Sequence, residues 1–118
     1  MMKPLMMFYP SKAKRSIVLE SWFDHYNASF FNSALPKMRV YWYKFRKHNR
    51  HGATTFVKGT NQVCVILVNR NLEKSGCYAL QTVLHEMIHV FKPKALHGPE
   101  FRKEKLRLLK AGAYNDIV

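Results

Sequence analysis

The amino-acid sequence predicts an α+β fold in which an N-terminal helix packs on a small, three-stranded, mainly antiparallel sheet, followed by two more helices. Three observations indicate this fold. Apolar residues near the N-terminus recur every three or four positions, as on a helix with one buried face. Three short segments rich in β-branched and aromatic residues follow. Two stretches with helical periodicity complete the chain, and this order of elements is typical of α+β folds.

The first helix is expected to begin near Ser11, whose hydroxyl can accept a hydrogen bond from a backbone N–H of the first turn. Asn32 and Ser33 are turn residues that end the helix, and Pro36 prevents it from continuing. The apolar face of this helix consists of Leu19, Trp22, Phe23, Tyr26 and Phe30.

Three strands are expected in the middle of the chain, at 37–45 (KMRVYWYKF), 53–59 (ATTFVKG) and 62–69 (QVCVILVN). Polar turns at 46–52 and 59–61 separate them. The last strand is apolar on both faces, which is typical of a strand covered on both sides.

Two helices are expected in the C-terminal half. Pro93 ends the first of them, and the second begins with Pro99 and stops at Gly112. His85 and His89 lie one turn apart on the first helix, roughly opposite its apolar face. That face consists of Leu80, Val83, Leu84, Met87, Ile88 and Phe91.

The length of 118 residues is enough for one hydrophobic core, so we expect a single domain over 1–118 with its core at about 11–112. Lys and Arg number 20 against 7 Asp and Glu, a formal charge of +13. So large an excess favours a polyanionic partner, nucleic acid or an acidic membrane surface, over a basic protein with no such partner.

Other features of the composition narrow the class of protein. No run of eighteen apolar residues is present, which excludes a membrane-spanning helix, and we expect no membrane association. Cys64 and Cys77 do not form a CxxC pair or a disulfide framework. We therefore expect both cysteines to be reduced thiols in a cytoplasmic protein. We also expect the protein to be a monomer.

The segment HEMIHVFKPKALHGPEF, residues 85–101, contains three of the six histidines. His85 and His89, one helical turn apart, can bind one Zn²⁺ through ring nitrogens. Glu86 lies about 100° around the helix and can reach a water on the metal without being a ligand. Zinc lowers the pKa of such a water from 15.7 to about 7. Glu86 would then act as the general base that takes its proton.

A catalytic zinc usually has three protein ligands and one open position. The HExxHxxGxxH pattern does not apply, because Lys92 and Ala95 stand where it needs glycine and histidine. His97 is the preferred third ligand, with Glu100 and Glu104 as alternatives. The histidines could also form a solvated polar face. A purely structural zinc is disfavoured, because such sites are closed and usually rich in cysteine.

Aromatic residues are interleaved among basic residues in the segment 37–50, in which aromatic rings could stack on unpaired bases while the basic groups meet phosphates. We expect it to bind single-stranded or distorted DNA, and the alternative is a strand with one core face and one solvated basic face. The candidate contacts are Lys37, Arg39, Trp42, Lys44, Arg46, Lys47 and Arg50.

Five segments in order, FDHYNASFFNSALP, MRVYWY, VILVNRNL, TVLHEMIHVF and HGPEF, resemble the SprT-like family of zinc metallopeptidases (Spartan-type protease domains) in a minimal single-domain form. The resemblance spans about residues 16–112. It implies a zincin-like fold with a cleft between the sheet and the HExxH helix. It further implies one Zn²⁺ per chain on His85, His89 and His97, with Glu86 as general base.

The expected function is zinc-dependent hydrolysis of peptide bonds in a protein or peptide substrate, extending to proteins bound to DNA. The alternative is a non-catalytic basic DNA-binding or adaptor module that uses zinc for stability. Glu86 disfavours this alternative, because neither kind of module needs a base beside the metal.

Overall fold

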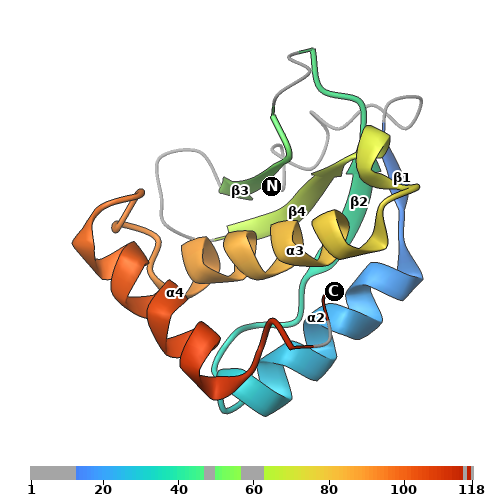
Figure 1. Ribbon diagram of the computed structural model, residues 1–118. Helices are drawn as coiled ribbons and strands as arrows, with labels where there is room; N and C mark the ends of the chain where they lie inside the picture. Colours follow the sequence, from blue (N-terminus) through green and yellow to red (C-terminus); the bar gives the residue numbers. More distant parts are fainter. Residues whose placement is uncertain (1–12, 47–49, 57–62, 116, 118) are drawn as a thin grey trace.

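The computed structural model describes residues 13–46, 50–56, 63–115 and 117, and its fold is α+β, as expected from the sequence (Figure 1). The strands are β1 (Ala13–Arg15), β2 (Arg39–Tyr43), β3 (Gly52–Phe56) and β4 (Val63–Asn69), and the helices are α2 (Ile17–Phe30), α3 (Gly76–Phe91) and α4 (Pro99–Ala111), with a short 3-10 helix at Arg70–Leu72. Residues 47–49 of the polar turn expected at 46–52, and all of the turn expected at 59–61, lie outside the described residues.

The sheet has four strands in the order β1-β2-β4-β3, so the expected number of three strands is wrong, although two of the three strand pairs are antiparallel, as expected. β1 and β3 pair antiparallel with their neighbours, but β2 and β4 run parallel in the centre. The sequence does not predict β1, because this strand is only three residues long. It includes Lys14 and Arg15 and lacks the alternation of apolar and polar residues that marks a half-buried strand. The parallel pair arises because β3 occupies the edge beyond β4 instead of lying between β2 and β4.

The first helix begins at Ile17, and the expected start near Ser11 is wrong. Ser16 is the N-cap, and its Oγ accepts a hydrogen bond of 3.1 Å from the backbone N–H of Leu19. Residues 13–15 form β1 instead of a first helical turn. Ser11 itself lies outside the described residues.

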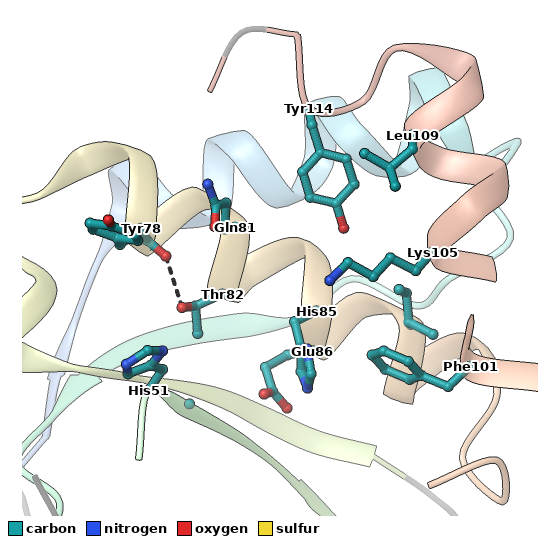
Figure 2. Close-up of a pocket in the computed structure, with 12 residues that line it drawn as sticks. His51, Tyr78, Gln81, Thr82, His85, Glu86, Phe101, Lys105, Leu109 and Tyr114 are labelled. Atoms are coloured by element: carbon teal, nitrogen blue, oxygen red, sulfur yellow. Dashed lines mark hydrogen bonds between the residues drawn. The ribbon is translucent and has the colours of Figure 1, made fainter. Parts of the chain in front are cut away.

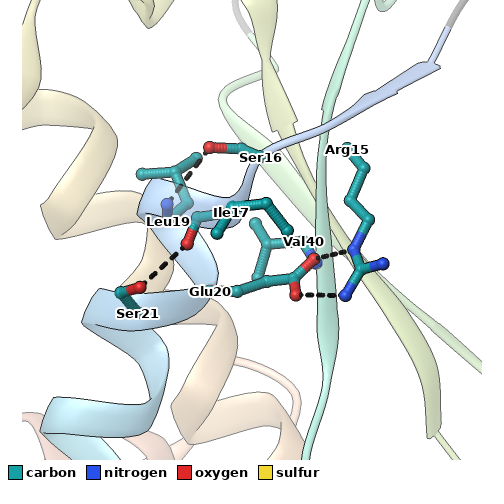
Figure 3. Close-up of polar contacts among 7 residues, drawn as sticks. All are labelled: Arg15, Ser16, Ile17, Leu19, Glu20, Ser21 and Val40. Atoms are coloured by element: carbon teal, nitrogen blue, oxygen red, sulfur yellow. Dashed lines mark hydrogen bonds and ion pairs between the residues drawn. The ribbon is translucent and has the colours of Figure 1, made fainter.

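Glu20 joins β1, α2 and β2 at this corner of the fold (Figure 3). Its carboxylate accepts hydrogen bonds of 2.7 and 2.8 Å from the guanidinium of Arg15 and one of 3.1 Å from the backbone N–H of Val40. Because Glu20 is only 5% exposed, these three hydrogen bonds replace the water that its carboxylate loses.

The remaining helix ends agree with the sequence analysis. α2 ends at Phe30, just before Asn32 and Ser33, whose φ angles are 52° and 57°. α3 ends at Phe91, two residues before Pro93. α4 has Pro99 as its first residue, and Gly112 caps it with a φ of 90°, a conformation that glycine adopts without steric strain.

The hydrophobic core lies between the sheet and the helices α2 and α3, with α4 beside α3 (Figure 1). Four residues of the predicted apolar face of α3 are completely buried, namely Val83, Leu84, Met87 and Ile88. β4 is buried on both faces from Val65 to Val68, as expected. α3 is therefore held on several sides, which fixes the side chains that it directs away from the core.

Two further features concern the class of protein. In the described part of the chain, no helix has both the length and the apolar character that a bilayer span requires. Cys77 is a free thiol, and the side chain of Cys64 lies outside the described residues.

Candidate metal centre and catalytic cleft

Three imidazole rings converge where α3 meets the turn before α4. The Nε2 atom of His97 lies 3.1 Å from that of His85 and 3.2 Å from that of His89. His85 and His89 come from successive turns of α3, as their spacing predicts. His97 returns to them through a tight turn in which the N–H of Gly98 donates to the carbonyl of Ala95 at 3.0 Å.

The geometry of this cluster, and the lowered pKa values of His85 and His89, fit a metal ion. Tetrahedral zinc with nitrogen ligands at 2.0–2.1 Å places two such nitrogens about 3.3 Å apart, close to the separations found. Burial, together with the nearby His89 and His97, lowers the pKa of His85 to about 4. Burial also lowers the pKa of His89. Neutral imidazoles at neutral pH have the free lone pair that metal binding requires.

The structure favours His97 over the two glutamates as the third member of this cluster. Among the described residues, the ligand atoms that converge within 4.8 Å of one another belong to His85, His89 and His97. Glu104 instead forms an ion pair of 2.7 Å with Arg107. Glu100 is exposed on the first turn of α4 and is not a member of the cluster.

Phe101 supports all three rings, a role that the sequence analysis did not assign. Its ring centroid lies 4.7 Å from that of His85, 4.9 Å from that of His89 and 5.1 Å from that of His97. Phe101 is only 5% exposed, so its position is set by the core. The signal was present in the segment HGPEF, because Phe101 follows His97 by four residues at the start of a helix.

Glu86 lies beside this cluster but faces the edge strand β3. It is 4% exposed, and Thr54 Oγ1 donates a hydrogen bond of 2.7 Å to its Oε1 atom. Burial raises the pKa of Glu86 to about 7, although the hydrogen bond from Thr54 and the charge of Arg50 lower it. A carboxyl with a pKa near neutrality is well matched to general base catalysis.

Gly52 allows β3 to approach α3 this closely. In the β3–β4 register, Gly52 pairs with Val68 and Thr54 with Ile66, so both residues face α3. A Cβ atom at position 52 would lie 2.5 Å from Thr82 Cγ2 and 3.2 Å from Glu86 Oε2. The sequence signal was a glycine next to a predicted strand, which often marks a close approach of the backbone.

Two cavities, of about 680 and 500 Å³, flank His85 and Glu86, which line both of them. Figure 2 shows the first cavity, in which the side chains of Tyr114 and Lys105 point towards His85. The second cavity extends from Arg50 and Thr54 to Leu96 and the other two histidines. The histidine cluster and Glu86 therefore lie in a cleft between the edge strand and the helices α3 and α4.

The predicted DNA contacts are distributed unevenly. Lys47 lies outside the described residues, and Trp42 is half-buried against the core. Arg50 lies over the ring of Phe45 at 5.6 Å and also lines the second cavity, so the basic segment meets the cleft at this residue. The remaining predicted contacts, Lys37, Arg39, Lys44 and Arg46, are exposed.

Comparison with known protein families identifies the family to which this chain belongs. The model of the SprT-like family matches residues 19–116. The chain belongs to the SprT-like family. The matched span includes the histidine cluster, Glu86, Phe101 and both strand residues that face Glu86. Searches of curated proteins and of solved structures gave no significant match.

Proposed function

We propose that this SprT-like protein is a zinc-dependent metallopeptidase that hydrolyses peptide bonds in protein or peptide substrates. The observation that carries the proposal is the position of Glu86, a buried carboxyl next to three converging imidazole nitrogens and open to a cleft. Three nitrogen ligands leave a fourth position for water or substrate, as is usual in catalytic rather than structural zinc sites.

His85, His89 and His97 would hold the zinc ion, which, when bound, would polarise the substrate carbonyl and acidify a water molecule. Glu86 Oε1 is occupied by the hydroxyl of Thr54, which leaves Oε2 to accept the proton of the attacking water. Glu86 then passes this proton to the amine nitrogen of the departing peptide. The substitution of Gln for Glu86 removes this proton transfer without removing a ligand.

The edge strand beside the cleft suits an extended peptide. β3 pairs with β4 on one side, and in the described part of the chain no strand lies on its other side. An extended peptide can add to such an edge through backbone hydrogen bonds. Gly52, Ala53 and Thr54 of β3 also line the second cavity, so this edge borders the proposed reaction site.

We further propose that DNA-bound proteins are among the substrates. The formal charge of +13 and the exposed Lys37, Arg39, Lys44 and Arg46 support it. Arg50 connects this basic segment to the cleft. The alternative is a non-catalytic module stabilised by zinc. It gives no reason to bury Glu86, because burying a carboxyl costs stability even with the hydrogen bond from Thr54, and a structural metal site does not need one.

The test compares wild type with Glu86→Gln after metal removal and reloading with zinc, using unfolded casein as substrate. Wild type should cleave casein only when zinc is bound. Glu86→Gln should bind one zinc per chain but lose about 10²–10⁴ in rate, the usual contribution of a general base. Equal rates for the two proteins, or cleavage by the metal-free protein, would contradict the proposal.

A further inference from the structure

Leu96 has two unfavourable features at once. Its φ angle is 51°, in the left-handed region, where a bulky side chain is strained. Its side chain is also 72% exposed, so burial in the core does not offset this strain. Asn32 adopts a similar φ of 52°, but a short polar side chain tolerates that conformation. Glycine or asparagine would avoid both features at position 96.

The left-handed backbone at Leu96 is needed to form a turn, but this does not explain why residue 96 is a leucine. Leu96 lies in the turn that the Gly98 N–H closes on the Ala95 carbonyl, and this turn brings His97 back to His85 and His89. Any residue that adopts the left-handed conformation would serve this purpose. A reason for the apolar side chain must therefore come from what it contacts.

The side chain of Leu96 lines the cavity of about 500 Å³ that also contains Glu86 and the histidine cluster. Its apolar neighbours in the lining are Pro93 and Ala53. Leu96 is thus an exposed apolar residue at the edge of the proposed reaction site, next in sequence to a proposed metal ligand.

We propose that Leu96 is a specificity-determining residue that contacts an apolar side chain of the substrate next to the bond that is cut. This inference rests on the proposed function, because it takes the cleft to be a peptide-binding site. Substrates with a leucine or similar residue at that position would bury apolar surface against Leu96, whereas serine or glutamate would not.

The experiment measures peptide binding without cleavage. Zinc-loaded Glu86→Gln is titrated by fluorescence anisotropy with labelled octapeptide mixtures in which one position is fixed as Leu, Ser or Glu. When the fixed position is the one that contacts Leu96, the Leu mixture should bind about tenfold more tightly than the Ser mixture. This is the effect expected from burying part of a leucine side chain. Adding Leu96→Asn should remove this difference, while Leu96→Met should retain it. Leu106→Asn is the matched control, because Leu106 is 50% exposed on α4 and lines neither cavity.

Melting temperature and zinc content separate this role from a structural one. Leu96→Asn should bind one zinc and melt at the same or a higher temperature, because asparagine tolerates the left-handed conformation. A lower melting temperature would assign Leu96 to stability and overturn the inference, as would a Leu preference that survives Leu96→Asn. If wild type cleaves no peptide but the Leu96-dependent preference is found, the proposed hydrolysis fails, and what stands of the inference is that Leu96 selects an apolar side chain of a bound peptide. If wild type cleaves peptides without that preference, only the inference fails.

Discussion

Thr54 on the edge strand donates a hydrogen bond of 2.7 Å to Oε1 of Glu86 on α3, and its hydroxyl lies 3.3 Å from the Glu86 carbonyl oxygen. Two residues that are 32 positions apart in sequence therefore share one polar contact beside the histidine cluster. The contact restricts the rotation of a carboxyl group whose other oxygen is left to receive a proton. Thr54 is a positioning residue for the proposed general base.

Thr54→Val should lower kcat about tenfold, because the loss of one hydrogen bond to a charged group costs about 1.5 kcal/mol. KM and zinc content should stay the same, since the hydrogen bonds that the Thr54 hydroxyl makes go to Glu86 and not to the three histidines. Thr54→Ser keeps the hydroxyl and should restore most of the rate. Steady-state kinetics on a labelled peptide checks this, and full activity in Thr54→Val would contradict the positioning role.

Phe101→Leu should weaken zinc binding about tenfold, the low end of the effect seen when a group that orients metal ligands is changed. The reason is that the flat ring of Phe101 packs against all three histidine rings, and leucine cannot contact them in the same way. Competition with a chromophoric chelator measures the affinity. The metal-free variant should lose about 1–2 kcal/mol of unfolding free energy from imperfect repacking. If the zinc affinity were unchanged while the unfolding free energy fell, Phe101 would contribute to the core but would not orient the histidine rings.

Glu20→Gln should change the stability of the protein in acid. The hydrogen bonds from Arg15 lower the pKa of Glu20, burial raises it, the bond from the Val40 N–H lowers it, and the net shift is downward from 4.5. Because the folded pKa is below the unfolded value, this stabilisation is present above about pH 4.5 and is lost as pH falls through the folded pKa. Glu20→Gln should therefore be less stable by about 1–2 kcal/mol at pH 7. It should also lose less stability than wild type between pH 4.5 and pH 3.

Urea unfolding of the metal-free proteins across this pH range measures the effect. Glu73→Gln, which removes one exposed carboxyl that has no side-chain partner among the described contacts, controls for the change in net charge. The role of the Arg15–Glu20 pair would be wrong if Glu20→Gln and wild type lost stability in parallel as the pH falls.

Replacement of Lys44 and Arg46 by Ala should reduce the salt dependence of binding to single-stranded DNA. If each side chain meets one phosphate, the log–log slope against salt concentration should flatten by about 1.4. Lys103 and Lys110 are exposed on α4, away from the basic segment, and their double replacement serves as the control. A fluorescence-anisotropy titration at several salt concentrations decides it. An unchanged slope would favour the alternative interpretation, in which the basic side chains of this segment only form a solvated face of the strand.

Much of the site could be predicted because its signals are local. Residues one turn apart on a helix lie side by side, so the spacing of His85 and His89 determines that their rings meet. Pro93 and Gly112 mark helix ends, because proline cannot continue a helix and glycine alone adopts the left-handed cap freely. Local reasoning also predicts His97 as the third ligand, but it leaves Glu100 and Glu104 as alternatives. The structure favours His97, because its ring lies beside those of His85 and His89.

The sequence by itself thus determined the α+β class, the helix that carries the HExxH motif and the helix ends marked by Pro93, Pro99 and Gly112, since these follow from periodicity and from the conformational limits of proline and glycine. The tertiary structure placed the helix cap at Ser16 instead of the expected Ser11, because β1 pairs with β2 and takes residues 13–15 out of the helix. It also decided the parallel centre of the sheet and the contact of Thr54 with Glu86. Both depend on strand order and register, which are set by packing between segments far apart in the chain.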